Sequence, residues 1–200
     1  MSTKLPRADR RAQLLEVARD IVRELGTDAL TLGSLAERAG VSRPITYSHF
    51  ETRAGLFIAL YKDISDHQLR DLADAVHQTP SKLEGVARVI AQAYIDCQIT
   101  VGPEAYTIAA ALKGDPEMDA FQREVVTSHV EFCCRVLSPL SPLSDEIVRR
   151  RCAAIIGSVE ALSQELLHGL VKKEDTVDDL SSLISTWLDT SRYSRNDFNR

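Results

Sequence analysis

The chain has 200 residues, of which 44% are hydrophobic and 26% charged, enough apolar material for one or two globular domains. Charged residues interrupt every long apolar stretch well short of the roughly 20 residues that span a bilayer, and residues 1–11 lack the apolar run of an export signal. These features argue against a membrane or exported protein and predict a cytoplasmic one.

The net charge of −5 is distributed unevenly. Residues 1–55 contain nine Lys and Arg against seven Asp and Glu, a net of +2, which leaves 15 against 22, a net of −7, for residues 56–200. A basic N-terminal segment can meet nucleic-acid phosphates, while an acidic remainder discourages indiscriminate adhesion to DNA. We therefore expect two domains, 1–55 and 56–200, with any nucleic-acid contacts in the first.

Residues 1–7 precede the first helical pattern, and Lys4 and Arg7 could either follow a DNA backbone or remain in a solvated tail. A helix is predicted from Asp9 to Leu25, ended by Gly26, and it should support the motif that follows. Its apolar face consists of Leu14, Ala18, Ile21, Val22 and Leu25.

Two short helices joined by a sharp turn are predicted within residues 32–50. The first has small Ala36 where another helix can approach closely, and Gly40 where a helix C-terminus favours a left-handed residue. Ser42 is a suitable N-cap for the second helix, whose first turn tolerates Pro44 because an early N–H has no intrahelical partner. The polar second helix is typical of the recognition helix of a helix-turn-helix, although a tight corner between two helices would explain the AxxxGV spacing alone.

A longer pattern extends this motif on both sides. It comprises Thr31-Leu32, Ala36, Gly40, Val41-Ser42-Arg43, Thr46-Tyr47-Ser48-His49-Phe50, Thr52-Arg53 and Leu56-Phe57. This pattern resembles the N-terminal DNA-binding domain of the TetR family of transcriptional regulators over roughly residues 10 to 60. The resemblance implies an all-α fold, with an N-terminal three-helix helix-turn-helix domain followed by a C-terminal helical domain for ligand binding and dimerisation.

Several residues of the pattern are candidate DNA contacts. The guanidinium of Arg43 can bond guanine O6 and N7 in the major groove, or it could neutralise a phosphate instead. Pro44 could contact a thymine methyl, and Thr46 could serve either purpose. His49 could equally hold the motif together, and we have no account of the acidic Glu51. The resemblance implies DNA-backbone contacts for Thr31, Ser42, Tyr47, His49 and Arg53.

The rest of the chain has further helical patterns and no internal repeat or strand-like alternation. Helices are predicted at about 53–76 and 83–101, with Thr31 and Thr52 as N-caps of the helices on either side of the recognition helix. A shorter helix is predicted at 104–112 and a long one at 116–137. The Pro- and Ser-rich SPLSPLS that follows is the clearest linker in the chain.

The middle helices mix apolar walls with a few polar groups, as small-molecule pockets usually do. Each of these residues could instead be ordinary core. The TetR resemblance implies a pocket for a small effector, which we expect to be largely apolar and which the sequence does not identify. The candidate pocket residues are Tyr94, Cys97, Gln98, Tyr106, Phe121, His129, Phe132 and Cys133.

His129 and Cys133 are four residues apart on one predicted helix, and Cys97 could join them in a metal or redox site. Buried cysteines are also ordinary core residues. Without CxxC spacing or export features, Cys97, Cys133, Cys134 and Cys152 are expected to be free thiols. We expect no metal or other cofactor. No nucleophile elbow, phosphate loop or carboxylate pair suggests an enzyme.

The last two predicted helices, within 144–171 and 177–191, each have a broad apolar face. Because small residues such as Gly157 permit close approach, the pair could simply complete the core of one subunit. The TetR resemblance implies instead a four-helix bundle with the same pair from a second subunit. The candidate interface residues are Val148, Ile155, Val159, Leu162, Leu166, Leu180, Leu183, Ile184 and Trp187.

Together these features predict a homodimeric, sequence-specific transcriptional regulator. Its partners would be a palindromic operator in double-stranded DNA and an effector that releases it, which makes it a repressor. A ligand-independent architectural DNA binder and a small helical enzyme with a Cys/His site are the alternatives.

Overall fold

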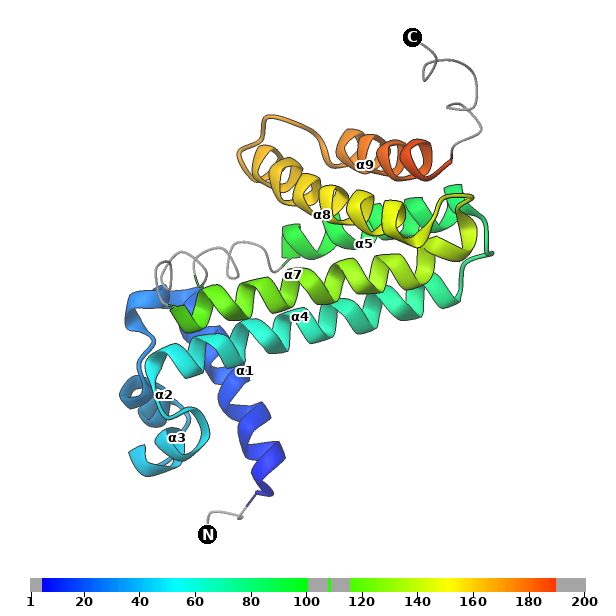
Figure 1. The fold of residues 1–200 in the computed structure, drawn as a ribbon. Helices are drawn as coiled ribbons and strands as arrows, with labels where there is room; N and C mark the ends of the chain where they lie inside the picture. Colours follow the sequence, from blue (N-terminus) through cyan, green and yellow to red (C-terminus); the bar gives the residue numbers. More distant parts are fainter. Residues whose placement is uncertain (1–4, 101–107, 109–115, 190–200) are drawn as a thin grey trace. The chain divides into compact units, whose positions relative to one another are not determined.

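The computed structural model describes residues 5–100, 108 and 116–189, and every regular element among them is a helix. The predicted all-α fold is thus confirmed. The chain forms two compact units, residues 1–66 with 101–122 and residues 67–100 with 123–200. Two long helices, α4 (Arg53–His77) and α7 (Pro116–Leu137), each contribute residues to both units (Figure 1).

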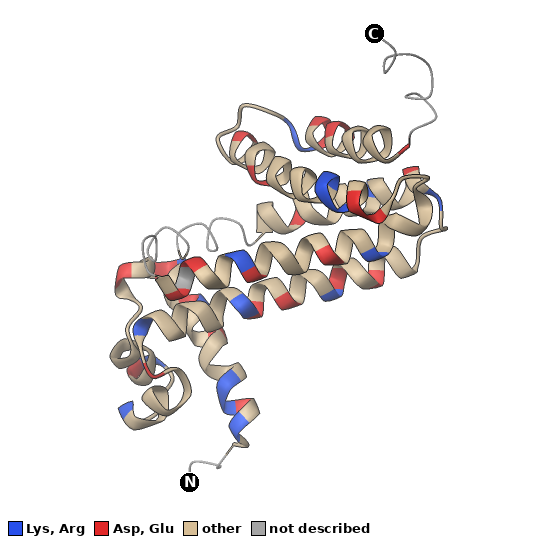
Figure 2. Cartoon of the chain, viewed as in Figure 1, with Lys and Arg blue, Asp and Glu red and all other residues tan. Residues whose placement is uncertain are grey.

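The first unit is built on α1 (Arg7–Leu25), α2 (Leu32–Arg38), α3 (Arg43–Phe50) and the start of α4. A 3-10 turn, Thr27–Ala29, connects α1 to α2. Basic residues gather on the first turns of α1 (Figure 2). Buried apolar residues of all four helices form the core together with Leu30 of the connection between α1 and α2. The helical residues are chiefly Leu14, Ala18, Ile21, Leu35, Phe50, Leu56, Phe57 and Leu60.

Local sequence rules set the boundary between α1 and α2. Gly26 ends α1 with a φ of 80°, a region that residues with a Cβ adopt only with strain. Thr31 caps α2 as predicted, because its hydroxyl accepts the Ser34 N–H at 3.0 Å. In return, Ser34 Oγ accepts the Thr31 N–H at 3.0 Å, which completes a capping box.

An unusually tight turn joins α3 to α4. Glu51 has a φ of 61° and a ψ of −55°, and the Thr52 N–H donates to the Phe50 carbonyl at 2.6 Å. This bond across a single residue defines a γ-turn, which is strained for a residue with a side chain. A Cβ on Gly55 would lie 2.3 Å from the same carbonyl oxygen, so the turn requires glycine there. Thr52 caps α4 as predicted, by accepting the Gly55 N–H at 2.9 Å.

The second unit contains α5 (Leu83–Thr100), α8 (Asp145–Leu167) and α9 (Lys173–Leu188), with parts of α4 and α7. α5 packs against both α8 and α9. Its apolar face supplies Val86, Ile90, Tyr94 and Ile95 to a core that α8 and α9 complete with Val148, Cys152, Ile155, Val159, Leu180, Ile184 and Leu188.

Two further predictions concern a linker at 138–144 and a short helix at 104–112. The 138–144 segment is more ordered than a linker, because it begins with a 3-10 turn, Ser138–Leu140, and the Ser141 hydroxyl donates to the Leu188 carbonyl at 2.7 Å. The helix predicted at 104–112 lies outside the described residues except for Ile108, which is buried. Over the described ranges, none of the helices has the length and apolarity that crossing a membrane requires.

We expect Gly55→Ala to destabilise the first unit, because a Cβ 2.3 Å from the Phe50 carbonyl oxygen forces the backbone to shift. The free energy of unfolding should fall by about 1–3 kcal/mol, as in other overpacked sites. Gly33→Ala is the control, since a Cβ there meets only ordinary contacts at 3.7 Å and alanine favours a helix. Urea unfolding measures both, and equal midpoints would contradict a rigid γ-turn.

Candidate nucleic-acid interface

Side chains on the inner face of α3 anchor it to the rest of the first unit. Thr46 is fully buried, and its hydroxyl can donate to the carbonyl of Leu32 on α2 or to that of Arg43, each 2.9 Å away. Phe50 is buried in the core four residues later, on the same side of the helix. The anchored pair of helices, α2 and α3, is a helix-turn-helix.

The turn between α2 and α3 closes through backbone hydrogen bonds. Gly40 has a φ of 65°, and its N–H donates to the Glu37 carbonyl at 3.2 Å, while the Val41 N–H donates to the Ala36 carbonyl at 2.9 Å. These two bonds form a Schellman motif, the usual end of a helix at glycine. The predicted role of Gly40 is confirmed.

Ser42 occupies the predicted N-cap position of α3 with an extended backbone, but its side chain makes no capping hydrogen bond. The reason lies in the next residues. Pro44 has no N–H to donate, and the Ile45 N–H donates to the Ser42 carbonyl at 2.9 Å. The exposed hydroxyl of Ser42 therefore remains directed to its surroundings rather than to the helix.

The outer face of α3 presents Arg43, Pro44 and Tyr47, all exposed, with Tyr47 at 53%. The Arg43 guanidinium lies beside the first turn of α2, since a Cβ on Gly33 would be 3.7 Å from its Nε and Nη2. Thr31, at the start of α2, is also exposed. A guanidinium, a proline ring and a phenol on one anchored helix can contact base edges and phosphates together.

Two predicted DNA contacts are used inside the protein. Burial and its hydrogen bond give Thr46 a structural role and take its hydroxyl out of the surface, and its DNA contact stays a prediction. The spacing of four residues from apolar Phe50 is the sequence signal for this burial. Arg53 donates from Nε to the Leu30 carbonyl at 2.9 Å and from Nη2 to the Thr27 carbonyl at 2.8 Å. Its phosphate contact remains a prediction, whereas its structural role is visible.

Basic residues at the start of α1 adjoin the end of α3, and of these only Arg7 was a candidate from the sequence. The signal is the basic run RADRR, which begins at Arg7. Burial first, and then the positive charges of Arg7, Arg11 and Arg10, lower the pKa of His49, so its imidazole is neutral at pH 7. The half-buried His49 ring lies with its centroid 6.0 Å from that of Phe50.

The segment that holds this interface also matches a known family. Residues 14–60, from the middle of α1 to the first turns of α4, match the profile of bacterial regulatory proteins of the tetR family. This chain belongs to the TetR family.

Relatives of this TetR-family chain include an activator and a repressor. The HTH-type transcriptional activator FasR of Mycolicibacterium smegmatis is 31% identical over 46% of this chain and 42% of its own. The class A tetracycline repressor of transposon 1721 from Escherichia coli is 30% identical over 60% of this chain and 52% of its own. The aligned part thus spans about half the length of these curated relatives.

A solved structure extends the likeness to the whole fold of this TetR-family chain. A proposed transcriptional regulator from Pseudomonas aeruginosa PAO1 has a TM-score of 0.77 over 96% of this chain and 97% of its own. At 14% identity this likeness concerns the fold alone.

In the second unit of this TetR-family chain, Tyr94 of α5 and His129 of α7 are in contact, with ring centroids 5.7 Å apart. His129 Nδ1 lies 2.8 Å from the Val125 carbonyl, so this nitrogen carries the proton and donates it. Burial lowers the pKa of His129 and raises that of Tyr94. The neighbouring Cys133 thiol is a weak partner, and the buried Tyr94 hydroxyl has no well-formed hydrogen bond within the described ranges.

The other predicted pocket residues are more dispersed. Cys97 and Gln98 are half-buried on α5, and Phe132 is buried on α7. Phe121 belongs to the first unit, where it makes an edge contact with Tyr61 at 5.8 Å between centroids. Tyr106 lies outside the described residues.

All four cysteines are free thiols, as predicted. Burial raises the pKa of Cys97 to about 11 and that of Cys133 to about 12, so both are protonated and weakly nucleophilic at neutral pH. Among the described residues, no group of three or more His, Cys, Asp or Glu side chains is arranged to hold a metal ion.

Five predicted dimer contacts belong instead to the core of the subunit. Val148, Ile155, Val159, Leu180 and Ile184 are at most 4% exposed, because α8 and α9 turn their apolar stripes toward α5. Their part in a dimer interface stays a prediction, since an apolar stripe indicates burial without naming the partner.

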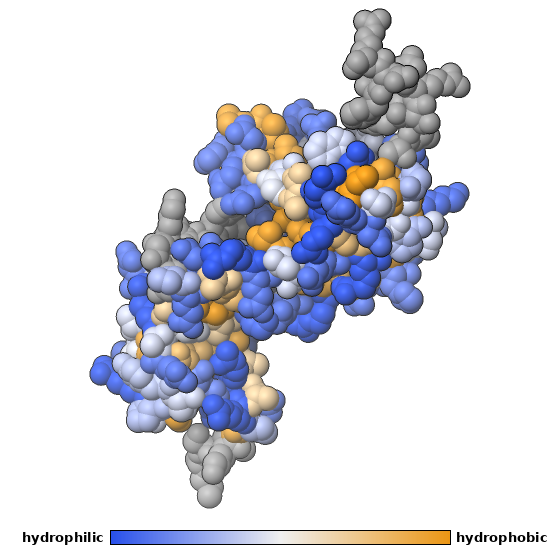
Figure 3. Space-filling view, viewed as in Figure 1, coloured by the Kyte–Doolittle hydropathy of each residue, from blue (hydrophilic) through white to orange (hydrophobic). Residues whose placement is uncertain are grey.

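Other residues of α8 and α9 remain at the surface. Leu162, Leu166 and Leu183 are half-buried, and Trp187 is 37% exposed. Apolar surface also lies over the α8–α9 connection, where Leu167 and Leu170 are exposed (Figure 3). The middle of α8 exposes a group of small residues at helical spacing, namely Ala153, Ala154, Gly157 and Ala161.

The lowered pKa of His129 predicts a pH-dependent stability. The folded chain favours neutral imidazole, so the unfolded chain binds more protons, and the stabilisation present above about pH 6.5 is lost as the pH falls. His129→Gln should flatten this loss between about pH 7 and 5, leaving the contribution of His49. Urea unfolding across this range tests it, with exposed His168→Gln as control. An unchanged slope in His129→Gln would refute the assignment.

Proposed function

We propose that this TetR-family chain is a sequence-specific, DNA-binding transcriptional regulator that binds a palindromic operator as a homodimer. The DNA-binding domain would comprise residues 1–55, with effector binding and dimerisation in 56–200. The observation that carries the proposal is the anchoring of α3 by Thr46 and Phe50, with Arg43, Pro44 and Tyr47 on the opposite, exposed face. A recognition helix enters a major groove in this way.

The charges of the first unit support the same function. Arg7, Arg10 and Arg11 lie at the start of α1, close enough to the end of α3 for their charges to act on His49. Contacts of cationic residues with phosphates supply most of the affinity for DNA, and contacts with base edges supply the specificity. Arg43 is our candidate for a base-edge contact.

We infer repression as the mode of regulation, although the matched relatives include both an activator and a repressor. Repression requires only that the protein occupy its operator. The two recognition helices of a dimer must lie about 34–36 Å apart, or a multiple of that, to enter successive major grooves. An effector that favours another spacing would release the operator.

The effector site is proposed around Tyr94, His129 and Cys133. The Tyr94 hydroxyl, which has only the Cys133 thiol as a weak partner, lies in apolar surroundings. A buried polar group gains stability when it finds a well-formed hydrogen bond. A small, largely apolar molecule with one hydrogen-bond acceptor would supply the partner for it. By linkage, operator DNA and such an effector weaken each other's binding by the same factor, typically about 1–3 kcal/mol of coupling.

Arg43→Ala tests the proposed base contact. The probes are a duplex selected by the unmodified protein from a random-sequence library and a scrambled duplex of the same composition. We expect Arg43→Ala to lose about 1–3 kcal/mol on the selected duplex and much less on the scrambled one, because a phosphate contact would affect both. Equal losses would reassign Arg43 to the DNA backbone, and a selection without a preferred sequence would overturn sequence-specific binding.

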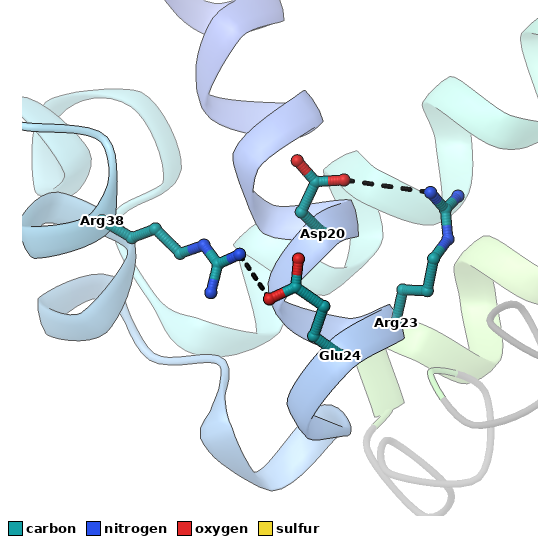
Figure 4. Close-up of polar contacts among 4 residues, drawn as sticks. All are labelled: Asp20, Arg23, Glu24 and Arg38. Atoms are coloured by element: carbon teal, nitrogen blue, oxygen red, sulfur yellow. Dashed lines mark hydrogen bonds and ion pairs between the residues drawn. The ribbon is translucent and has the colours of Figure 1, made fainter.

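Arg38→Ala is the matched control, because it also removes one arginine from the helix-turn-helix. Arg38 Nη2 lies 2.5 Å from Oε2 of Glu24 on α1, and Asp20 and Arg23 form a second ion pair close by (Figure 4). Both pairs are well exposed to water, where ion pairs contribute little to stability. Arg38→Ala should therefore leave the ratio of the affinities for the selected and scrambled duplexes unchanged.

A second prediction concerns the dimer, which we propose forms through the exposed small residues in the middle of α8. Gly157 is exposed there, and a Cβ would meet nothing within 4 Å in the described part of the subunit. Gly157→Glu should therefore leave the subunit folded but place a charge in the interface and give monomers in light scattering. Gly157→Ala, which keeps the surface apolar, is the control. A monomeric unmodified protein at micromolar concentration would refute the dimer.

A further inference from the structure

The end of α3 leaves four carbonyl groups without partners in the helix itself. Backbone groups of the following turn satisfy two of them. The Glu51 N–H donates to the Tyr47 carbonyl at 2.9 Å, and the Thr52 N–H donates to the Phe50 carbonyl at 2.6 Å. Within the described ranges, no backbone N–H of the turn donates to the carbonyls of Ser48 and His49.

The γ-turn explains why these two carbonyls are left over. α2 ends in a Schellman motif, in which Gly40 and Val41 return two N–H groups to the last turn of the helix. That motif needs a left-handed residue after the helix. Glu51, at a ψ of −55°, directs the chain away instead, so its successors cannot return to Ser48 and His49.

Two arginines of α1 supply the missing donors. Arg11 Nη1 donates to the His49 carbonyl at 2.8 Å, and Arg7 Nη2 donates to the Ser48 carbonyl at 3.3 Å. The Arg11 guanidinium also lies 4.9 Å from the centroid of the Phe50 ring. A cation is favourable here for a second reason, because the C-terminus of a helix carries partial negative charge.

We propose that Arg11, assisted by Arg7, is a positioning residue that caps the recognition helix from α1 and fixes the orientation in which α3 meets DNA. This inference rests on the proposed DNA-binding function. Arg11 contributes more to the cap than Arg7 does, because its hydrogen bond is shorter, its side chain is half-buried and its guanidinium lies over an aromatic ring. Arg7 is exposed and its bond is longer.

The cap matters because α3 has only eight residues and cannot hold its conformation alone. Thr46 ties its middle to α2, while its last turn runs into a strained γ-turn that persists only if its surroundings hold it. Without the arginine cap, the last turn can unwind and the helix can pivot about Thr46. Arg43 and Tyr47 on the outer face would then lose their common geometry.

The test compares Arg11→Ala with Arg10→Ala in the full chain. Both remove one positive charge from neighbouring positions, but Arg10 Nη1 bonds Gln13 on its own helix at 2.5 Å. The probes are the duplex selected by the unmodified protein and its scrambled counterpart, each titrated over a range of salt concentrations. The measured quantities are the ratio of the two affinities and the slope of each affinity with salt.

We expect Arg11→Ala to reduce the affinity ratio by about tenfold, the effect of losing one good base contact, with a salt slope like that of Arg10→Ala. Arg11→Lys should recover binding to the scrambled duplex but not the full ratio, because lysine has charge without the planar fork. The inference is overturned if the ratio is unchanged. It is also overturned by a second result. Arg11→Ala would weaken binding to both duplexes equally, and its affinity would change with salt concentration by a slope lower by about one than that of Arg10→Ala, as the loss of a phosphate contact requires.

Amide hydrogen exchange without DNA gives an independent readout. Arg11→Ala should speed exchange at residues 47–52 and leave α4 and the rest of α1 as in Arg10→Ala, and unchanged exchange at 47–52 would refute the cap. If Arg11→Ala unfolds the whole unit, hydrogen exchange at residues 47–52 is compared between Arg11→Lys and Arg10→Ala instead, and that comparison tests the cap. A selection that yields no preferred sequence would contradict the proposed function, while the exchange experiment would still test the cap.

Discussion

The hydroxyl of Thr46 joins two helices that are each too short to be stable alone. α2 has seven residues and α3 has eight, so neither can retain a helical conformation in water without contacts to its neighbours. The Thr46 bond to the Leu32 carbonyl fixes the distance between the helices, and Phe50 fixes the side of α3 that faces the core. The exposed residues of α3 proposed to contact DNA, Arg43, Pro44 and Tyr47, take their direction from this contact.

The helix boundaries were predictable because they depend on local chemistry. Gly26 and Gly40 have positive φ, and Thr31 and Thr52 accept N–H groups of the turns that they precede. Such signals act over three or four residues, so the sequence displays them directly. Ser42 shows the limit of the rule, because it occupies the N-cap position of α3 and yet its side chain makes no capping hydrogen bond.

Predictions that depend on distant partners were less secure. Thr46 is a polar residue whose acceptor is 14 residues away, so its type alone could not show whether it faces outward or inward. The stripes of α8 and α9 marked Val148 and Ile184 correctly as buried, but α5 rather than a second subunit covers them. For the effector, Tyr94 and His129 do meet, while Phe121 belongs to the other compact unit.

The single-residue joint at Glu51 has a mechanical consequence. Ordinary loops absorb a displacement of one helix before it reaches the next, because several soft dihedral angles lie between them. Here only Glu51 and Thr52 separate α3 from α4. The hydrogen bond from the Thr52 N–H to the Phe50 carbonyl and the close approach of Gly55 to that carbonyl restrict the dihedral angles of this connection. A shift or tilt at the start of α4 therefore displaces the recognition helix by a similar amount.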